Sequence, residues 1–148
     1  MRWLSMVALA MTFAVPDRPA PDPPIRNNPA LLDGVWAVVA YEYDGGRHTP
    51  EQLSAYPNLI VKAGTYRWSN AESGGQMKID STKSPPTVDY TSPEGVHLGI
   101  FEIQGDTFRD CMARPGKERP REFTVPPGSG HVLMVYRRVR NGDDSSNR

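Results

Sequence analysis

The residues of this chain that could bind a metal are three histidines and one cysteine. His48, His97 and His131 stand far apart, and none belongs to a His-x-His or Cys-x-x-Cys pattern, the short spacings typical of metal sites. We therefore predict no metal and no cofactor, with the histidines at the surface or at strand ends. Cys111 has no second cysteine with which to form a disulfide in the chain. We interpret it as a small buried side chain in a strand, with a reactive thiol or an intermolecular link as the alternative.

Two carboxylates, Glu102 and Asp110, could take part in acid–base chemistry, but no spacing in the sequence pairs them. An inward-facing Asp110 would be either paired or functional, because burying an unpaired carboxylate is costly. Gly128-Ser129-Gly130 is not the Gly-x-Ser-x-Gly of a serine nucleophile, and Gly116-Lys117 lacks the glycine-rich approach of a phosphate loop. The sequence therefore predicts a protein that is not an enzyme. An enzyme that uses an inward Asp110 or Glu102 is the third-ranked hypothesis.

Charge is balanced along the chain, with 17 basic and 17 acidic residues. A chain without net charge has no field to attract nucleic acid or an anionic membrane, so we expect neither as a partner. One basic cluster stands out at Arg114–Arg121. Arg119 and Arg121 could bind an anion or a partner through bidentate contacts. We favour the structural alternative, in which Glu118 and Glu122 satisfy these arginines within a loop.

Fifteen prolines and 13 glycines interrupt the chain at short intervals, and between them apolar residues recur at a spacing of two. This pattern is typical of short strands joined by turns. We expect one short helix or turn near 50–56, and strands over residues 35–43, 58–62, 65–69, 76–80, 87–91, 96–103, 107–113, 121–125 and 131–138. In the first strand, Trp36, Val38 and Ala40 share one face, and Tyr41 and Tyr43 lie on the other. The predicted fold is an all-β, antiparallel, up-and-down eight-stranded barrel, since closure leaves no exposed edge strand.

The two ends of the chain differ in composition from the middle. Arg2, an apolar run and the small residues around Phe13 are typical of a secretory signal, which we place at residues 1–14. Residues 15–30 hold six prolines and are predicted to be an extended spacer. The barrel is expected over residues 31–140 and a disordered tail over residues 141–148. The protein is therefore expected to be exported to the periplasm or the exterior, with no membrane span after signal cleavage.

Gly34-Val35-Trp36 resembles the Gly-x-Trp motif that opens lipocalin-type barrels. In that family the tryptophan closes one end of the barrel and an arginine of the last strand packs over it. The resemblance implies that Gly34, Trp36 and one or both of Arg137 and Arg138 close this barrel.

A longer resemblance includes residues 98–103 and 105–108 and is most specific at residues 114–123. Pro115-Gly116-Lys117-Glu118-Arg119-Pro120-Arg121-Glu122-Phe123 is similar to a segment of an uncharacterised lipocalin-like domain of planctomycete bacteria. That family has no assigned activity, so the resemblance implies a fold and no chemistry. Asp110 departs from it, since such domains usually carry an apolar residue there.

Large side chains on the expected inner faces could line a pocket or fill the barrel. They are Trp36, Tyr66, Trp68, Met77, Tyr90 and Phe101. An eight-stranded barrel is just wide enough to be filled by side chains or to hold one small ligand. We therefore predict an exported lipocalin-like module that binds a small apolar ligand or a protein partner of the cell envelope. The alternative is a structural or interaction barrel with a filled core.

Overall fold

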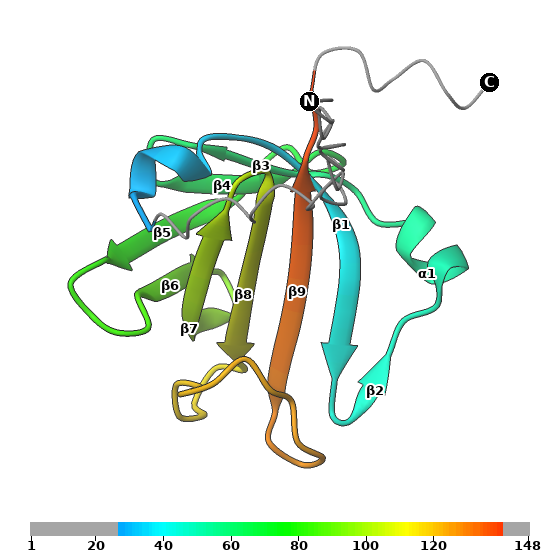
Figure 1. The fold of residues 1–148 in the computed structure, drawn as a ribbon, viewed down its shortest axis with the longest axis vertical. Coiled ribbons are helices and arrows are strands. Elements are labelled where there is room, and N and C mark those ends of the chain that lie inside the picture. Colours follow the sequence, from blue (N-terminus) through cyan, green and yellow to red (C-terminus); the bar gives the residue numbers. More distant parts are fainter. Residues whose placement is uncertain (1–26, 141–148) are drawn as a thin grey trace, which may run out of the picture.

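The computed structural model describes residues 27–140, whose strands form one antiparallel sheet that closes on itself (Figure 1). The strands are β1 (Gly34–Tyr43), β2 (Gly46–Arg47), β3 (Leu59–Lys62), β4 (Thr65–Trp68), β5 (Gly75–Asp80), β6 (Thr87–Ser92), β7 (Gly95–Gln104), β8 (Thr107–Ala113) and β9 (His131–Arg138). From β3 onward each strand pairs with the next one in the chain, and β1 pairs with both β3 and β9. The predicted all-β, eight-stranded up-and-down barrel is confirmed, with β2 as an added strand at the end of β1.

Helical structure in the described residues is confined to two short segments. The first, α1 (Pro50–Ser54), lies within the predicted range, with proline at its start and a capping box before it. In that box the side chain of Gln52 accepts a hydrogen bond of 2.8 Å from the backbone N–H of Thr49. The second, η1 (Pro29–Leu32), is a 3-10 turn that begins inside the predicted spacer. The folded unit therefore starts a few residues before residue 31.

A β-bulge in β1 changes which residues face the interior. Val38 and Ala40 lie opposite consecutive residues of β9, so Val39 has no partner there. An extra residue in one strand reverses the alternation of inward and outward side chains beyond it. Val38 is therefore buried before the bulge, and Tyr41 packs against the core after it. The expectation that Ala40 faces inward and Tyr41 outward is wrong.

The strand expected over residues 121–125 does not form. β8 is already paired with β7 on one side and β9 on the other, so no sheet edge is free to accept another strand there. The segment belongs to a loop over residues 114–130 that lies against the outer face of the barrel. The loop is held through side chains: the guanidinium of Arg109 lies 4.1 Å from the ring centroid of Phe123, and the thiol of Cys111 donates to the carbonyl of Thr124 at 3.6 Å.

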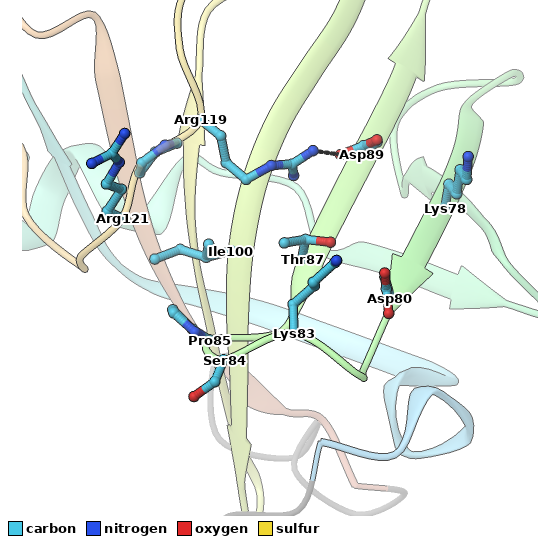
Figure 2. Close-up of a pocket in the computed structure, with 11 residues that line it drawn as sticks. Lys78, Asp80, Lys83, Ser84, Pro85, Thr87, Asp89, Ile100, Arg119 and Arg121 are labelled. Carbon is cyan, nitrogen blue, oxygen red and sulfur yellow. Dashed lines mark ion pairs between the residues drawn. The ribbon is translucent and has the colours of Figure 1, made fainter.

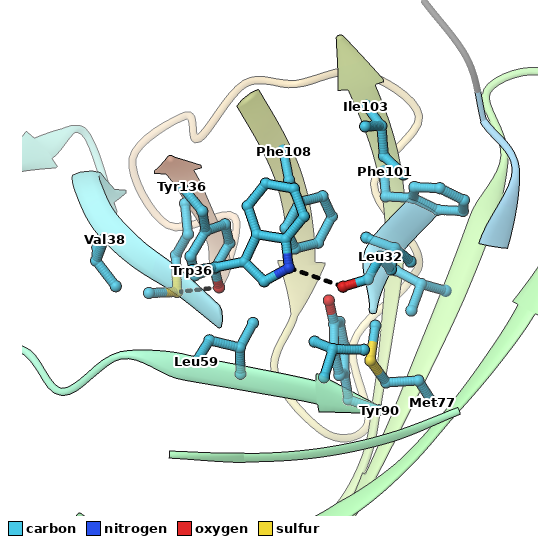
Figure 3. Close-up of a cluster of buried hydrophobic side chains, with 13 residues drawn as sticks. Leu32, Trp36, Val38, Leu59, Met77, Tyr90, Phe101, Ile103, Phe108 and Tyr136 are labelled. Carbon is cyan, nitrogen blue, oxygen red and sulfur yellow. Dashed lines mark hydrogen bonds between the residues drawn. The ribbon is translucent and has the colours of Figure 1, made fainter. Parts of the chain in front are cut away.

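The core fills one half of the barrel around Trp36 (Figure 3). The rings of Trp36 and Phe108 meet edge to face, with centroids 5.6 Å apart, and Phe108 stacks on Tyr136 at 4.9 Å. Phe101 and Ile103 of β7 complete this half, and all of these side chains are buried. Alternation along each strand therefore produces one continuous apolar interior.

The expected signal segment (residues 1–14), most of the expected spacer and the expected tail (residues 141–148) lie outside the described residues. Between residues 27 and 140, no helix has the length and apolar character needed to cross a bilayer.

Candidate functional site

The two ends of the barrel differ, and the end near η1 is closed by Trp36. Its indole N–H donates a buried hydrogen bond of 2.7 Å to the carbonyl of Leu32 in η1. The guanidinium of Arg138 lies over the indole, 4.1 Å from the ring centroid, and donates to the carbonyl of Asp33 at 2.8 Å. Trp36 and Arg138 are opposite each other in the β1–β9 register. This end of the barrel is sealed by a cation–π contact and by hydrogen bonds to the chain before β1.

Gly34 is required for this closure. Its φ is +143°, and a Cβ on it would lie 2.5 Å from the Nη1 atom of Arg138. Any side chain there would push the guanidinium away from the carbonyls that it binds. Arg137, the other arginine considered for closure, is exposed on the outer face because adjacent residues of a strand point to opposite sides. Of the two arginines, the structure assigns closure to Arg138.

The opposite half of the barrel contains a hollow of about 150 Å³, here called the inner hollow. It is lined by Leu59, Tyr66, Trp68, Tyr90, His97, Met112 and Tyr136. Since one water occupies about 30 Å³ of liquid, this hollow has room for a handful of waters or a small chemical group. The interior is therefore not filled along its whole length.

A larger hollow of about 630 Å³ lies at the open end of the barrel, and we call it the mouth hollow. Trp68, His97 and Met112 line both hollows, so the two adjoin at these side chains. Tyr41 and Tyr56 form part of its wall, with ring centroids 5.4 Å apart. The mouth hollow thus has aromatic walls and leads toward the inner hollow.

An aromatic cluster holds the rim of the mouth hollow in place. The imidazole of His48 stacks on Tyr41, with centroids 4.5 Å apart and planes inclined by 12°. Tyr43 and Tyr56 pack against the same imidazole at 5.2 Å and 5.6 Å. The bulge at Val39 directs Tyr41 inward, and the short helix α1 turns the chain so that Tyr56 reaches Tyr41 and His48. Both features are therefore needed for this cluster.

A buried polar pair lies inside the barrel beside the inner hollow. The hydroxyl of Tyr90 donates a hydrogen bond of 2.5 Å to Asp110, and both side chains are buried. Burial raises the pKa of Asp110 to about 7, against a smaller lowering by the Tyr90 hydroxyl. The second carboxylate oxygen, Oδ1, has no hydrogen-bond partner. Asp110, whose direction the sequence left open, therefore faces the interior, and its hydrogen-bond partner is a hydroxyl rather than a cation.

Glu102 does not face the interior. It follows the inward-facing Phe101 in β7 and forms an ion pair of 3.1 Å with Arg109 on the outer face. The hypothesis that an inward Glu102 could be catalytic is therefore wrong. Among residues 27–140 no three His, Cys, Asp or Glu side chains lie close enough together to hold a metal ion.

The predicted ligand-binding residues fall into two groups. Tyr66, Trp68 and Tyr90 line the inner hollow, and Trp68 also lines the mouth hollow. Trp36, Met77 and Phe101 are buried in the packed core and line neither. Sequence reasoning missed the other lining residues, which include Tyr41, Tyr56, Glu94, His97, Met112, Arg114, Val132, Met134 and Tyr136. Alternation back from Phe101 could have identified His97, and the pairing of the next strand could have identified Met112. The inward direction of Tyr41 could not have been predicted, because it depends on the bulge at Val39.

The basic segment is part of the outer loop. Arg119 donates to the carbonyl of Gly99 at 2.7 Å and forms an ion pair of 2.7 Å with Asp89. The expectation that Glu118 and Glu122 satisfy these arginines is wrong: Arg119 is held by Asp89 and by backbone carbonyls, and Arg121 forms no ion pair within residues 27–140. Cys111 is buried on the outer face beneath the same loop, and burial raises the pKa of its thiol to about 11.

These observations define an up-and-down β-barrel that is plugged at one end and hollow at the other. No protein-family model, curated protein or solved structure matches this chain. The resemblance of residues 114–123 to a lipocalin-like domain therefore stays a prediction.

Proposed function

We propose that this protein binds a small, mainly apolar molecule in the open half of its barrel. The observation that carries the proposal is the pair of adjoining hollows, of about 630 Å³ and about 150 Å³, inside an otherwise packed barrel. Sites for small molecules are concave, mostly apolar, on the order of 300–1,000 Å³, and carry a few polar groups. The mouth hollow lies within that size range, and the adjoining inner hollow extends it; both have the expected kind of lining.

The lining residues favour a ligand with a flat, unsaturated or aromatic body. Tyr41, Tyr56 and Trp68 offer ring faces in the mouth hollow, and Met112 offers a polarisable thioether. Deeper in, the imidazole of His97 and the hydroxyl oxygens of Tyr90 and Tyr136, whose protons go to Asp110 and Met134, offer hydrogen bonds to a polar end of the ligand. The ligand would enter with its polar end first and leave its apolar body among the rings at the mouth.

Two substitutions of the same kind test this site. Val132→Trp places an indole into the mouth hollow, whereas Val96→Trp places one on the outer face of β7, where Val96 is 44% exposed. With anilinonaphthalene sulfonate as a fluorescent apolar probe, we expect Val132→Trp to weaken binding about tenfold, or about 1.4 kcal/mol. Val96→Trp serves as the control and should leave binding within about twofold of the parent. Equal binding by all three proteins would contradict the proposal.

Native mass spectrometry of the protein purified from its own source tests for a natural ligand. We expect a bound mass that disappears on denaturation and is reduced in Val132→Trp but not in Val96→Trp. A bound mass that the two variants retain equally would place the ligand outside the barrel.

Export is a separate part of the proposal, and it rests on residues 1–14. An exported protein would be recovered from the envelope or the medium with a mass that lacks this segment. Intact protein confined to the cytoplasm would contradict export and leave the binding proposal standing.

The packed half of the barrel favours a second candidate, a structural or interaction module without a ligand. Trp36, Phe101 and Phe108 pack together in that half, and all three side chains are fully buried. On this alternative the open half holds only water, and the apolar probe would bind no more tightly than it does to Val132→Trp.

A further inference from the structure

A second concave site lies on the outside of the barrel, away from both hollows. It is a groove of about 620 Å³ between the outer face of β5–β7 and the 114–130 loop. We call it the outer groove and define it by Lys78, Lys83, Ile100, Arg119, Pro120 and Arg121 (Figure 2). None of its lining residues lines the inner hollow or the mouth hollow. It is therefore a distinct site.

The floor of the outer groove is apolar and fixed. Ile100 points outward from β7 but is only 2% exposed, because the loop and the Pro85 turn cover it. Pro120 is fully buried. Arg119 is held by Asp89 and by the carbonyls of Gly99 and Val88. The loop wall is thus anchored to the barrel, and the groove is preformed.

Positive charge gathers at the rim, although the whole chain has no net charge. Four cations, Lys78, Lys83, Arg119 and Arg121, face two carboxylates, Asp80 and Asp89, which leaves an excess of two positive charges. Asp89 is paired with Arg119, and Asp80 accepts hydrogen bonds from Thr82. The pKa of Asp80 is lowered first by Thr82 and then by Lys83 and Lys78.

The remaining cations lie on opposite sides of the apolar floor. Figure 2 shows Arg121 on one side of Ile100, and Lys83 and Lys78 on the other. Within residues 27–140, none of these three cations forms an ion pair. The groove therefore offers two separated positive ends, and the buried side chains of Ile100 and Pro120 support its base between them.

We propose that the outer groove binds a small organic dianion whose two carboxylates are joined by an apolar linker. One carboxylate meets Arg121, whose guanidinium suits bidentate contact. The other meets Lys83 and Lys78, and the linker lies along the groove between these two ends. This site is independent of the ligand proposed for the barrel interior.

The test is a titration of the full chain, labelled with nitrogen-15, with glutarate, butyrate and inorganic phosphate at about 50 mM ionic strength, where surface charges are only partly screened. We expect saturable amide shifts at residues 78–84, Thr87, Arg119 and Arg121, with glutarate binding about tenfold more tightly than butyrate, which has one carboxylate. Phosphate should bind no better than butyrate, because it cannot reach both ends. Phosphate that binds as tightly as glutarate would overturn the two-ended dianion.

A charge-matched pair of double variants separates this groove from the general effect of charge. Lys83→Glu with Arg121→Glu reverses both ends, whereas Lys62→Glu with Arg137→Glu makes the same change in net charge at exposed positions elsewhere. We expect the Lys83→Glu/Arg121→Glu variant to bind glutarate about tenfold or more weakly than the parent. The Lys62→Glu/Arg137→Glu variant should stay within about twofold of the parent. An equal loss in both pairs, or no saturable shifts in the parent, would overturn the proposal. Anilinonaphthalene sulfonate binding in the barrel should be unchanged in either pair.

Discussion

At the scale of single residues, Asp110 has an uncommon environment for a carboxyl group. It is buried among apolar side chains, and its known hydrogen bond comes from the Tyr90 hydroxyl rather than from a cation. A buried carboxyl without a positive partner holds its proton to higher pH than the same group does in water. The interior therefore contains a group that changes charge near neutral pH.

The first prediction concerns the pH dependence of stability. The pKa of Asp110 is about 7 in the folded protein, against 3.8 for the free side chain. Because the folded state holds this proton more strongly, the stability from Asp110 is fully present below about pH 4 and is lost as pH rises through about 7. The whole loss is on the order of 4 kcal/mol. Urea unfolding at about pH 5 and about pH 8 would measure the larger part of this loss, on the order of 2–3 kcal/mol.

Asp110→Asn is the control, since an amide does not titrate. We expect the variant to lose much less stability than the parent over that range and to be the more stable protein at about pH 8. The comparison of the parent with Asp110→Asn isolates the contribution of Asp110 to the pH dependence of stability. Such a comparison is needed because Glu51 and Asp80, whose pKa values lie below their ordinary ones, change stability with pH in the opposite direction. Parallel pH curves for the two proteins would show that Asp110 is already ionised at neutral pH.

The second prediction separates the plug from the cavity wall. Trp36→Ala removes a buried indole and should cost about 3–5 kcal/mol of unfolding free energy. Trp68→Ala removes an indole of the same size that lines the two hollows, so it leaves a wider opening rather than a sealed void and should cost about 1–2 kcal/mol. Thermal or urea unfolding would compare them. A loss below about 1 kcal/mol for Trp36→Ala would mean that it is not a plug.

At the scale of elements, the 114–130 loop behaves as an external brace. It forms no strand in the structure, yet it covers Cys111 and Ile100 on the outer face and is anchored by Arg119. The prolines at 115, 120, 126 and 127 remove backbone donors and favour such a loop over a strand.

The third prediction tests that anchor against its neighbour. Arg119→Met keeps much of the side-chain volume but removes the bonds to Gly99 and Asp89, and should cost on the order of 1–3 kcal/mol. Arg121→Met changes an exposed arginine of the same loop that forms no ion pair within residues 27–140, and should stay within about 0.5 kcal/mol of the parent. Chemical unfolding would measure both. Equal small effects would mean that the loop is not held by Arg119.

At the scale of the whole molecule, the barrel is closed, but the pairings between neighbouring strands, here called seams, differ in length. β8 and β9 pair along the full length of β8, whereas β4 and β5 pair only at Thr65–Tyr66 with Gly75–Gln76. At the start of β5, Gly74 and Gly75 lie so close to Tyr66 that a Cβ at either position would collide with it. The β4–β5 seam lies beside Tyr66 and Trp68 of the inner hollow, so it is the place where the wall can open.

The fourth prediction is that native-state hydrogen exchange follows these seams. Amides of β4 and of the start of β5 should exchange through local opening, well before those of β7, β8 and β9, which should exchange close to the global unfolding free energy. Exchange followed by NMR on the full chain would measure both groups. Uniform protection across all seams would show that the barrel opens as one unit.

Much of the architecture was predictable from the sequence. Period-two alternation and turn residues indicate an antiparallel barrel, and the resemblance of Gly34-Val35-Trp36 to the Gly-x-Trp motif implies a tryptophan at one end. Alternation alone also excludes Glu102 from the interior once Phe101 faces inward, and it allows only one of Arg137 and Arg138 to reach Trp36, because neighbouring side chains of a strand point to opposite faces.

Tertiary structure alone decided the rest. The bulge at Val39, the docking of the 114–130 loop and the choice of Asp89 as the partner of Arg119 depend on contacts between residues distant in the chain. The same holds for the division of the interior into a packed half and a hollow half. Local pattern sets which face a side chain takes, whereas the space left inside depends on how all eight strands close together.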